Sequence, residues 1–283
     1  MRIPESELII NPDNSIYHLN LKPGDLATRI ITVGDPKRIQ LIRPYLDEVI
    51  MVSENREFYS LTGLYKGEPL SIISTGIGSD NIDIVITEVD ALFNIDFDTR
   101  LVKDEKVSVD FIRIGTSGGI REDVPVGTII LSEYCIGLES LLLYYESDHV
   151  REKALEAVVA EHAPEFPIPV YAIKAAPHLV NKFASLGKGG ITLTAAGFYG
   201  PQSRQVRAPI KLNIYEAVKA INYNGLNVTN FEMETAGIYG LGNVLGHNAL
   251  SINAIIANRL RGEFAEDPGK IVKELIDHAL QLI

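Results

Sequence analysis

The stretch RIITVGDPKR, at residues 29–38, is a β-branched run that stops at Gly34 and then opens a helix. Apolar residues recur after it at Ile39, Ile42 and Leu46, with the spacing of one helix face. A strand that passes through a glycine into a helix is typical of α/β folds, in which such helices connect parallel strands. The stretch therefore predicts an α/β protein.

The same alternation of strands and helices continues along the chain. The expected strands span residues 29–33, 58–64, 70–75, 111–114, 126–131, 170–174, 190–195 and 249–257. The expected helices span residues 82–93, 154–160, 232–245 and 270–282. This order implies an α/β fold with a largely parallel sheet. We predict one domain over residues 1–283, with the charge-rich residues 94–110 as a surface insertion.

Composition limits the class of protein. The net charge of −11 disfavours a general nucleic-acid binder, which would present a basic face. No apolar run approaches the about 18 residues of a membrane span, and residues 1–11 lack the apolar core of a signal peptide. A single cysteine, Cys135, excludes internal disulfides and suits the reducing cytoplasm, where we expect the protein.

The segment GFYGPQSR, at residues 197–204, arranges an aromatic ring, an amide and a guanidinium around a Gly-Pro turn. Gln202 offers one acceptor and two donors, and Arg204 offers a fixed fork of donors. With the ring of Phe198, these groups suit a flat polar heterocycle such as uracil. Loops of this composition are common, so the segment is informative only beside a sugar site and a phosphate site.

Two arginines near the start of the chain are candidates for binding phosphate. Gly34 lets the backbone approach an anion at a helix N-terminus, and Arg38 lies one turn into that helix. Arg56 is a further cation. For either arginine taken alone, a surface or structural ion pair is at least as good an explanation as phosphate binding.

A third arginine, Arg113, interrupts the otherwise apolar strand expected at 111–114. A buried arginine is costly unless it is paired or faces a ligand. We expect Thr116 to add a hydroxyl just beyond the strand, in the glycine-rich residues 115–119. Neither the P-loop pattern GxxxxGK[ST] nor the dinucleotide pattern GxGxxG occurs in the chain.

The segment FEMET, at residues 231–235, places two acids at the start of an expected helix. Carboxylates such as Glu232 and Glu234 suit ribose hydroxyls, because each accepts strong hydrogen bonds. Met233 between them can pack against the apolar side of the sugar. The helix dipole alone also favours acids at this position, so both interpretations stay open.

Six short segments occur in the order seen in the nucleoside phosphorylase-I family, which the chain resembles from about residue 17 onward. They are GDPKR (34–38), NREF (55–58), STGIG (74–78), RIGTSG (113–118), FEMET (231–235) and NR (258–259). The resemblance implies a single three-layer α/β/α domain around a mixed, partly barrel-like sheet. Within the family, residues 198–204 most resemble those of uridine phosphorylases, although Gly200-Pro201 reverses the usual Pro-Gly order.

The resemblance also implies a role for each matching residue. The phosphate ligands would be Gly34, Arg38, Arg56, Arg113 and Thr116. The ribose contacts would be His18, Glu232, Met233 and Glu234. The base contacts would be Phe198, Gln202, Arg204 and Arg259. Catalysis would rest on Arg204, Gln202, Arg113 and Glu234.

The reaction and assembly expected from the resemblance are those of pyrimidine salvage. Uridine and phosphate would give uracil and ribose 1-phosphate reversibly, with phosphate as co-substrate and no other cofactor. The family's hexamers are trimers of dimers, and His18 and Arg56 would enter the site of a neighbouring subunit. No metal is expected, apart from an interfacial potassium ion that would involve Glu57.

Three alternatives to a uridine phosphorylase remain. They are a purine or broad-specificity nucleoside phosphorylase, a nucleoside hydrolase of the same fold, and a catalytically silent nucleoside-binding protein. Asn258 stands where purine-cleaving relatives carry an aspartate, which favours a pyrimidine base.

Overall fold

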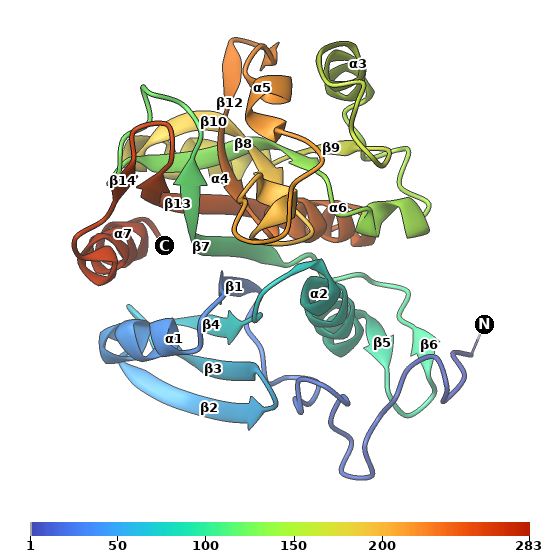
Figure 1. The fold of residues 1–283 in the computed structure, drawn as a ribbon. Coiled ribbons are helices and arrows are strands. Elements are labelled where there is room, and N and C mark those ends of the chain that lie inside the picture. The colour runs from blue at the N-terminus through green and yellow to red at the C-terminus, as the bar shows by residue number, and fades with distance from the viewer. Residues whose placement is uncertain (1) are drawn as a thin grey trace. The chain divides into compact units, whose positions relative to one another are not determined.

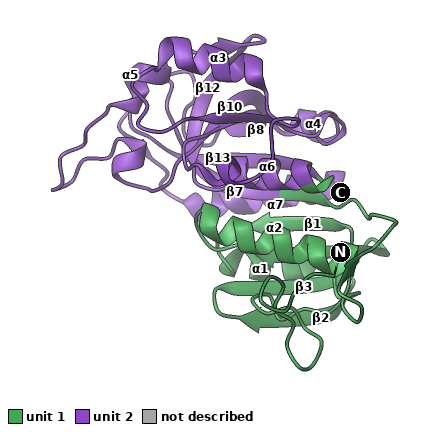
Figure 2. Cartoon of the chain, turned by 90° about the vertical axis from the view of Figure 1, so that its right-hand side faces the viewer, with its two compact units in different colours: residues 1–112, 245–247 green, residues 113–244, 248–283 purple. Residues whose placement is uncertain are grey.

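The computed structural model describes residues 2–283, and its strands and helices confirm the α/β class (Figure 1). The chain divides into two compact units (Figure 2). Unit 1 comprises residues 1–112 and 245–247, and unit 2 comprises residues 113–244 and 248–283. The single domain over 1–283 stays a prediction.

Unit 1 is built on a small sheet in the order β1-β4-β3-β2. Its elements are β1 (Arg29–Val33), α1 (Lys37–Ile42), β2 (Glu48–Asn55), β3 (Phe58–Tyr65), β4 (Glu68–Ser74), α2 (Ser79–Asn94), β5 (Ile95–Asp96) and β6 (Leu101–Val102). Strands β1 and β4 are parallel, so their carboxyl ends meet at one edge. A Cβ added to Gly34, after β1, would lie 3.4 Å from the carbonyl oxygen of Gly76, after β4.

The segment 94–110, predicted as a surface insertion, contains the short hairpin of β5 and β6. Its charged residues 104–106 are exposed, as expected. Arg100 is the exception, since it is buried and donates from Nε to the carbonyl oxygen of Ile3 at 2.9 Å. Its Nη2 also donates to the carbonyl oxygen of Leu8. The hairpin thus holds the N-terminal residues of unit 1.

Unit 2 contains five strands that close into a ring. Its elements are β8 (Ile129–Gly137), α3 (Lys153–His162), β9 (Tyr171–Lys174), α4 (Pro177–Phe183), β10 (Lys188–Thr194), α5 (Ile214–Val218), β11 (Asn222–Tyr223), β12 (Leu226–Glu232), α6 (Thr235–Leu245), β13 (Asn248–Asn258), β14 (Glu263–Phe264) and α7 (Pro268–Leu282), while β7 (Asp110–Gly119) runs into it from unit 1. The order is β12-β10-β8-β13-β7, and β12 also pairs with β7. The expected partly barrel-like sheet is confirmed.

The expectation of a largely parallel sheet is wrong. Strand β10 is parallel to β8 and β12, whereas β13 is antiparallel to β8 and β12 is antiparallel to β7. Apolar positions of β10 pack under two helices, because Ile191 and Leu193 share a core cluster with Leu155 of α3 and Val218 of α5. No helix within residues 2–283 is long and apolar enough to cross a membrane.

Strand β7 continues through the glycines that were expected to end it. A Cβ on Gly115 would lie 1.7 Å from Nη1 of Arg113, and one on Gly119 would lie 2.9 Å from the carbonyl oxygen of Val124. These glycines provide room for close neighbours rather than a flexible loop. Thr116 therefore lies within the strand, not beyond it as predicted.

Candidate active site

The segment 198–204, predicted to recognise the base, is a tight turn built around the 3₁₀ helix η4 (Gly200–Gln202). Pro201 occupies the start of that turn, where its fixed φ is compatible with the helix. Ser203 adopts a left-handed conformation with φ of 56°, and its hydroxyl accepts a hydrogen bond from the N–H of Ile214 at 2.8 Å. The reversed Gly-Pro order is thus accommodated in a closed turn.

The Arg204 guanidinium is packed within this turn. Its Nη1 donates to Oε1 of Gln202 at 2.5 Å and to the carbonyl oxygen of Phe198 at 2.6 Å. Its Cζ lies 3.7 Å from the centroid of the Phe198 ring, so one ring face is covered. Because Gln202 Oε1 is engaged, the amide nitrogen is the group that Gln202 has to offer a ligand. Partial burial lowers the pKa of Arg204.

Arg259 holds the same turn from its backbone side. Its Nη2 donates to the carbonyl oxygen of Gln202, and its Cζ lies 4.4 Å from the centroid of the Tyr215 ring. Burial, with the nearby charge of Arg204, lowers the pKa of Arg259 to about 10. Arg259 thus contacts the turn itself, which agrees with a role in supporting Arg204 and Gln202.

Arg113 lies in a buried ion cluster with two of the predicted ribose residues. Its Nη2 lies 2.5 Å from Oε2 of Glu234 and 3.3 Å from Oε2 of Glu232, and all three side chains are buried. Burial alone would lower the pKa of Arg113, but the two carboxylates outweigh it and raise that pKa. One guanidinium faces two carboxylates, so this Arg113 cluster carries net negative charge.

The acids of the cluster lie at the passage from β12 to α6. The helix begins at Thr235, three residues later than expected. Glu232 Oε2 accepts from the N–H groups of Glu234 (2.9 Å) and Thr235 (2.8 Å), and its Oε1 accepts from the hydroxyl of Thr194 (2.5 Å). The dipole interpretation therefore applies to Glu232. Its ribose contact stays a prediction, as does that of the half-buried Met233.

The base-recognition turn lies beside the strand that carries Arg113 and Thr116. A Cβ added to Gly118 of β7 would lie 3.6 Å from Nη2 of Arg204. Unit 2 thus holds the base-recognition turn next to Gly118 of β7, the strand whose Arg113 contacts the two acids.

His18, in unit 1, is held by a carboxylate that the sequence analysis missed. Its Nδ1 lies 2.6 Å from Oε1 of Glu88 on α2, and the same carboxylate accepts from the N–H groups of His18 and Leu19. With Nδ1 facing Glu88, Nε2 is the ring nitrogen left for a ligand. The other buried positions of α2 are apolar except for Asn94. A carboxylate among the apolar positions of a helix is the signal that could have pointed to Glu88.

Arg56 lies in the same cluster as His18. Its Nη2 lies 3.4 Å from the hydroxyl of Tyr17, whose ring makes an edge contact with His18. Asn55 donates to the carbonyl oxygen of His18 at 2.8 Å. Arg56 is exposed and has a left-handed backbone with φ of 56°. The two residues predicted to enter a neighbouring subunit therefore lie side by side.

The expectation that Arg38 lies one turn into a helix is wrong, because Arg38 is the second residue of α1. Helix α1 begins at Lys37 and has six residues, and the N–H of Lys37 already donates to Oδ1 of Asp35 at 2.9 Å. Arg38 is half-buried. The close approach of Gly34 to β4 gives this glycine a packing role in addition to the predicted phosphate role.

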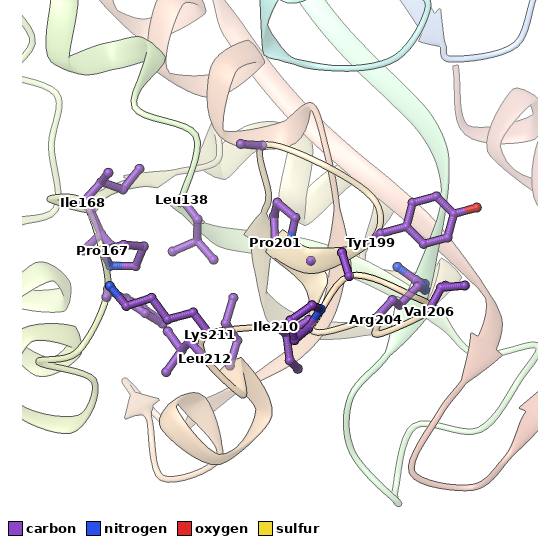
Figure 3. A pocket seen from close by; sticks show the side chains of 17 residues that line it. Leu138, Pro167, Ile168, Tyr199, Pro201, Arg204, Val206, Ile210, Lys211 and Leu212 are labelled. Atoms are coloured by element: carbon purple, nitrogen blue, oxygen red, sulfur yellow. The ribbon is translucent and has the colours of Figure 1, made fainter.

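A cavity of about 730 Å³ lies against the base-recognition turn in unit 2 (Figure 3). Its walls are largely apolar and include Leu138, Phe166, Ile168 and Leu212. Arg204 is the one predicted site residue that lines it. A nucleoside needs polar partners for its base and hydroxyls, so we do not assign the cavity to it. Within residues 2–283, no group of three or more His, Cys, Asp and Glu side chains is arranged to hold a metal ion.

Comparison with known proteins identifies several relatives. A family model of the phosphorylase superfamily matches residues 28–283. The uridine phosphorylase of Thermococcus kodakarensis is 32% identical over 271 residues, which cover 94% of this chain and 86% of that protein. A purine nucleoside phosphorylase, DeoD-type 2, of Vibrio cholerae is 26% identical over 93% of this chain and 96% of its own.

Among solved structures, a nucleoside phosphorylase of Trypanosoma brucei, described as showing uridine phosphorylase activity, is similar throughout. Its TM-score is 0.87 at 29% identity, with 98% of this chain and 100% of that chain covered. The two chains therefore share one fold over 98% of this chain.

Proposed function

Because the chain belongs to the phosphorylase superfamily, we propose that it is a uridine phosphorylase, which converts uridine and phosphate into uracil and ribose 1-phosphate. The observation that carries the proposal is the contact between Gln202 and Arg204 in a closed turn beside β7. It presents an amide and a guanidinium as one rigid pair of donors. The names of the Thermococcus and Trypanosoma relatives support the choice of base.

The uracil end provides electrostatic stabilisation of the leaving group. When the glycosidic bond breaks, its electron pair goes to the base, and negative charge spreads over the ring carbonyls. Donors from Gln202 and Arg204 strengthen as that charge grows, which lowers the barrier. Arg259 keeps the turn in place, and Phe198 offers its uncovered face to the base. The uracil anion then takes a proton from solvent.

The ribose end balances the opposite charge. The sugar passes through an oxocarbenium-like state, positive at the anomeric carbon. Glu234 and Met233 contact the ribose, with Glu232 beside them and His18 as a further contact. A phosphate oxygen forms the new bond to the anomeric carbon, so the reaction needs no covalent enzyme intermediate. Holding two substrates together supplies much of the rate.

The phosphate needs more positive charge than Arg113 provides. Its two carboxylate neighbours leave the Arg113 cluster net negative. We therefore assign Arg38 and Arg56 to the phosphate as further cations. Gly34 supplies a backbone N–H and Thr116 a hydroxyl.

The remaining family features are proposed together. The protein is a cytoplasmic homo-hexamer, a trimer of dimers, in which His18 and Arg56 enter a neighbouring subunit's site as a pair. Phosphate is the co-substrate, no cofactor is used, and a potassium ion near Glu57 lies at the interface. The proximity of His18 and Arg56 in unit 1 supports their joint contribution to the neighbouring site. Light scattering tests the hexamer.

The proposal is tested by incubating the protein with uridine, thymidine and inosine, each with and without phosphate. Uracil and ribose 1-phosphate should appear in equal amounts only when uridine and phosphate are both present. Thymidine should give thymine and 2-deoxyribose 1-phosphate to a lesser extent, and cleavage of inosine would contradict the proposal. Cleavage without phosphate would identify a hydrolase. Binding of uridine without any cleavage would identify the silent nucleoside-binding protein.

The purine alternative is weakened by the hydrogen bonds of Asn258. Its Nδ2 donates to the carbonyl oxygens of Arg121 (2.7 Å) and Val124 (2.8 Å), and its Oδ1 accepts from the N–H groups of Leu260 and Arg261. An aspartate has no donor for the two carbonyls. This amide is therefore committed to the loop and is not available to protonate a purine.

We predict that Asn258→Asp destabilises the protein by about 1–3 kcal/mol, because it sets a carboxylate against two carbonyl oxygens. It should not confer cleavage of inosine. Urea unfolding and the inosine assay measure the two effects. Asn181→Asp makes the same charge change at an exposed position and should alter stability by less than about 0.5 kcal/mol. Unchanged stability together with new inosine cleavage would contradict the argument.

A further inference from the structure

A circuit of hydrogen-bonded polar side chains, which starts at Arg113 and ends at Ser117, runs around the five-strand ring of unit 2. Successive hydrogen bonds of 2.6–3.0 Å join Arg113 to Asn253, Asn253 to Ser132, Ser132 to Thr192, Thr192 to Asn230, and Asn230 to Ser117. The first and last members both lie on β7, and each of the other strands contributes one member. Buried polar groups require partners, and here each is satisfied by the next strand.

Asn253 is the member that holds the guanidinium. Its Oδ1 accepts from Nη1 of Arg113 at 2.8 Å, whereas the other acceptor near Nη1, the hydroxyl of Ser251, is 3.4 Å away. Hydrogen bonds of this kind are strongest near 2.9 Å, so Asn253 is the main anchor of Nη1. Its own Nδ2 donates to the hydroxyls of Ser132 and Ser251, both at 3.0 Å. Asn253 has no exposed surface (0%).

A glycine makes room for this arrangement. A Cβ on Gly115 would lie 1.7 Å from Nη1 of Arg113 and 2.7 Å from Oδ1 of Asn253. The arginine side chain therefore lies along its own strand, over Gly115, and meets Asn253 there. With Nη1 held by Asn253 and Nη2 facing Glu234 and Glu232, Nε is the donor that Arg113 can direct at an anion.

We propose that Asn253 is a positioning residue, which orients Arg113 for phosphate. The inference rests on the proposed function, in which Arg113 binds that co-substrate. An amide suits the task because it accepts a hydrogen bond without adding charge. Glu232 and Glu234 already outnumber the guanidinium, and a third carboxylate would repel the phosphate further.

The test compares Asn253→Ala with Thr192→Val. Both variants lose hydrogen bonds of the same buried circuit, so both should lose stability to a similar extent. Only Asn253→Ala releases Nη1 of Arg113. It should raise the dissociation constant of inorganic phosphate, measured by calorimetry, about tenfold. The KM for phosphate should rise in parallel while the KM for uridine stays within twofold, and Thr192→Val should leave both unchanged.

If Asn253→Ala does not fold, Asn253→Ser takes its place, since it keeps a polar side chain but lacks the amide oxygen that accepts from Nη1. A folded Asn253 variant with phosphate affinity within twofold of wild type overturns the inference, as does an equal loss of affinity in Thr192→Val. A wild-type protein that binds phosphate but cleaves no nucleoside contradicts the proposed function alone, because the affinity comparison still decides the role of Asn253. Absence of phosphate binding in the wild type overturns both.

Discussion

Arg113→Ala should destabilise the protein by about 3–5 kcal/mol and remove phosphorolysis. The substitution leaves Glu232 and Glu234 buried without the cation that both of them face. Breaking a buried ion pair costs far more than a surface pair contributes, because an uncompensated charge stays out of water. Urea unfolding at neutral pH measures the loss, and the uridine assay measures the activity.

Lys270→Ala is the matched control, since it also removes one cation from an ion pair of unit 2. Lys270 and Glu274 are exposed and 4.0 Å apart, so the cost should be below about 1 kcal/mol. A loss of similar size in the two variants would contradict the buried-cluster argument.

Arg113→Lys separates charge from geometry. A lysine amine can still meet Glu234, but it lacks the planar fork that reaches Asn253 as well. We expect this variant to recover most of the stability and little of the activity. Full activity in Arg113→Lys would show that only the charge matters.

Elements bounded by local signals could be predicted from the sequence. The strand expected at 29–33 coincides with β1, and the strands expected at 58–64 and 70–75 overlap β3 and β4. Each is a β-branched or apolar run that ends at glycine or proline. Such signals depend on neighbours in the chain, so they survive without knowledge of the tertiary structure.

The closure of the ring depends on residues far apart in the sequence and could not be predicted in this way. Gly118 of β7 pairs with Phe231 of β12, a strand that was not among those expected. Thr229 and Asn230 make hydrogen bonds within unit 2, and these polar positions obscure the apolar pattern of β12. The glycines of β7 suggested a loop because the neighbours that fill the space beside them come from other strands.

The sequence indicated which residue types the candidate site would contain. It did not indicate the contacts that hold those residues in place. Arg113 stood out as a cation in an apolar strand, and Asn253 interrupted another apolar strand in the same manner. Two polar interruptions in buried strands need partners, and pairing them would have suggested their contact. The sequence could not show which pairs meet, because that depends on the strand order.

Arg204→Ala should lower kcat for uridine about 10²–10³-fold while changing stability by less than about 1 kcal/mol. The guanidinium is partly buried and contacts the turn, but no ion pair within residues 2–283 is assigned to it. In the proposed reaction, its main contribution is a donor that strengthens as the uracil leaves. The phosphate dissociation constant should stay within twofold of wild type.

Arg207→Ala, three residues further along, is the matched control. Arg207 is exposed, so the substitution removes the same charge from the same segment without touching the turn. It should leave kcat within twofold of wild type. A similar loss in both variants would indicate an effect of overall charge rather than of a positioned donor.

The contact between Arg204 and Gln202 predicts that substitutions of these two residues are coupled. Arg204 Nη1 fixes Oε1 of Gln202, so removing the arginine also releases the amide that should donate to uracil. The double variant Gln202→Ala/Arg204→Ala should therefore lose less kcat than the product of the two single losses. Either single substitution already disrupts the same pair of donors. Multiplicative effects would mean that the two side chains act on the base independently, and the rigid pair would not be the unit that recognises uracil.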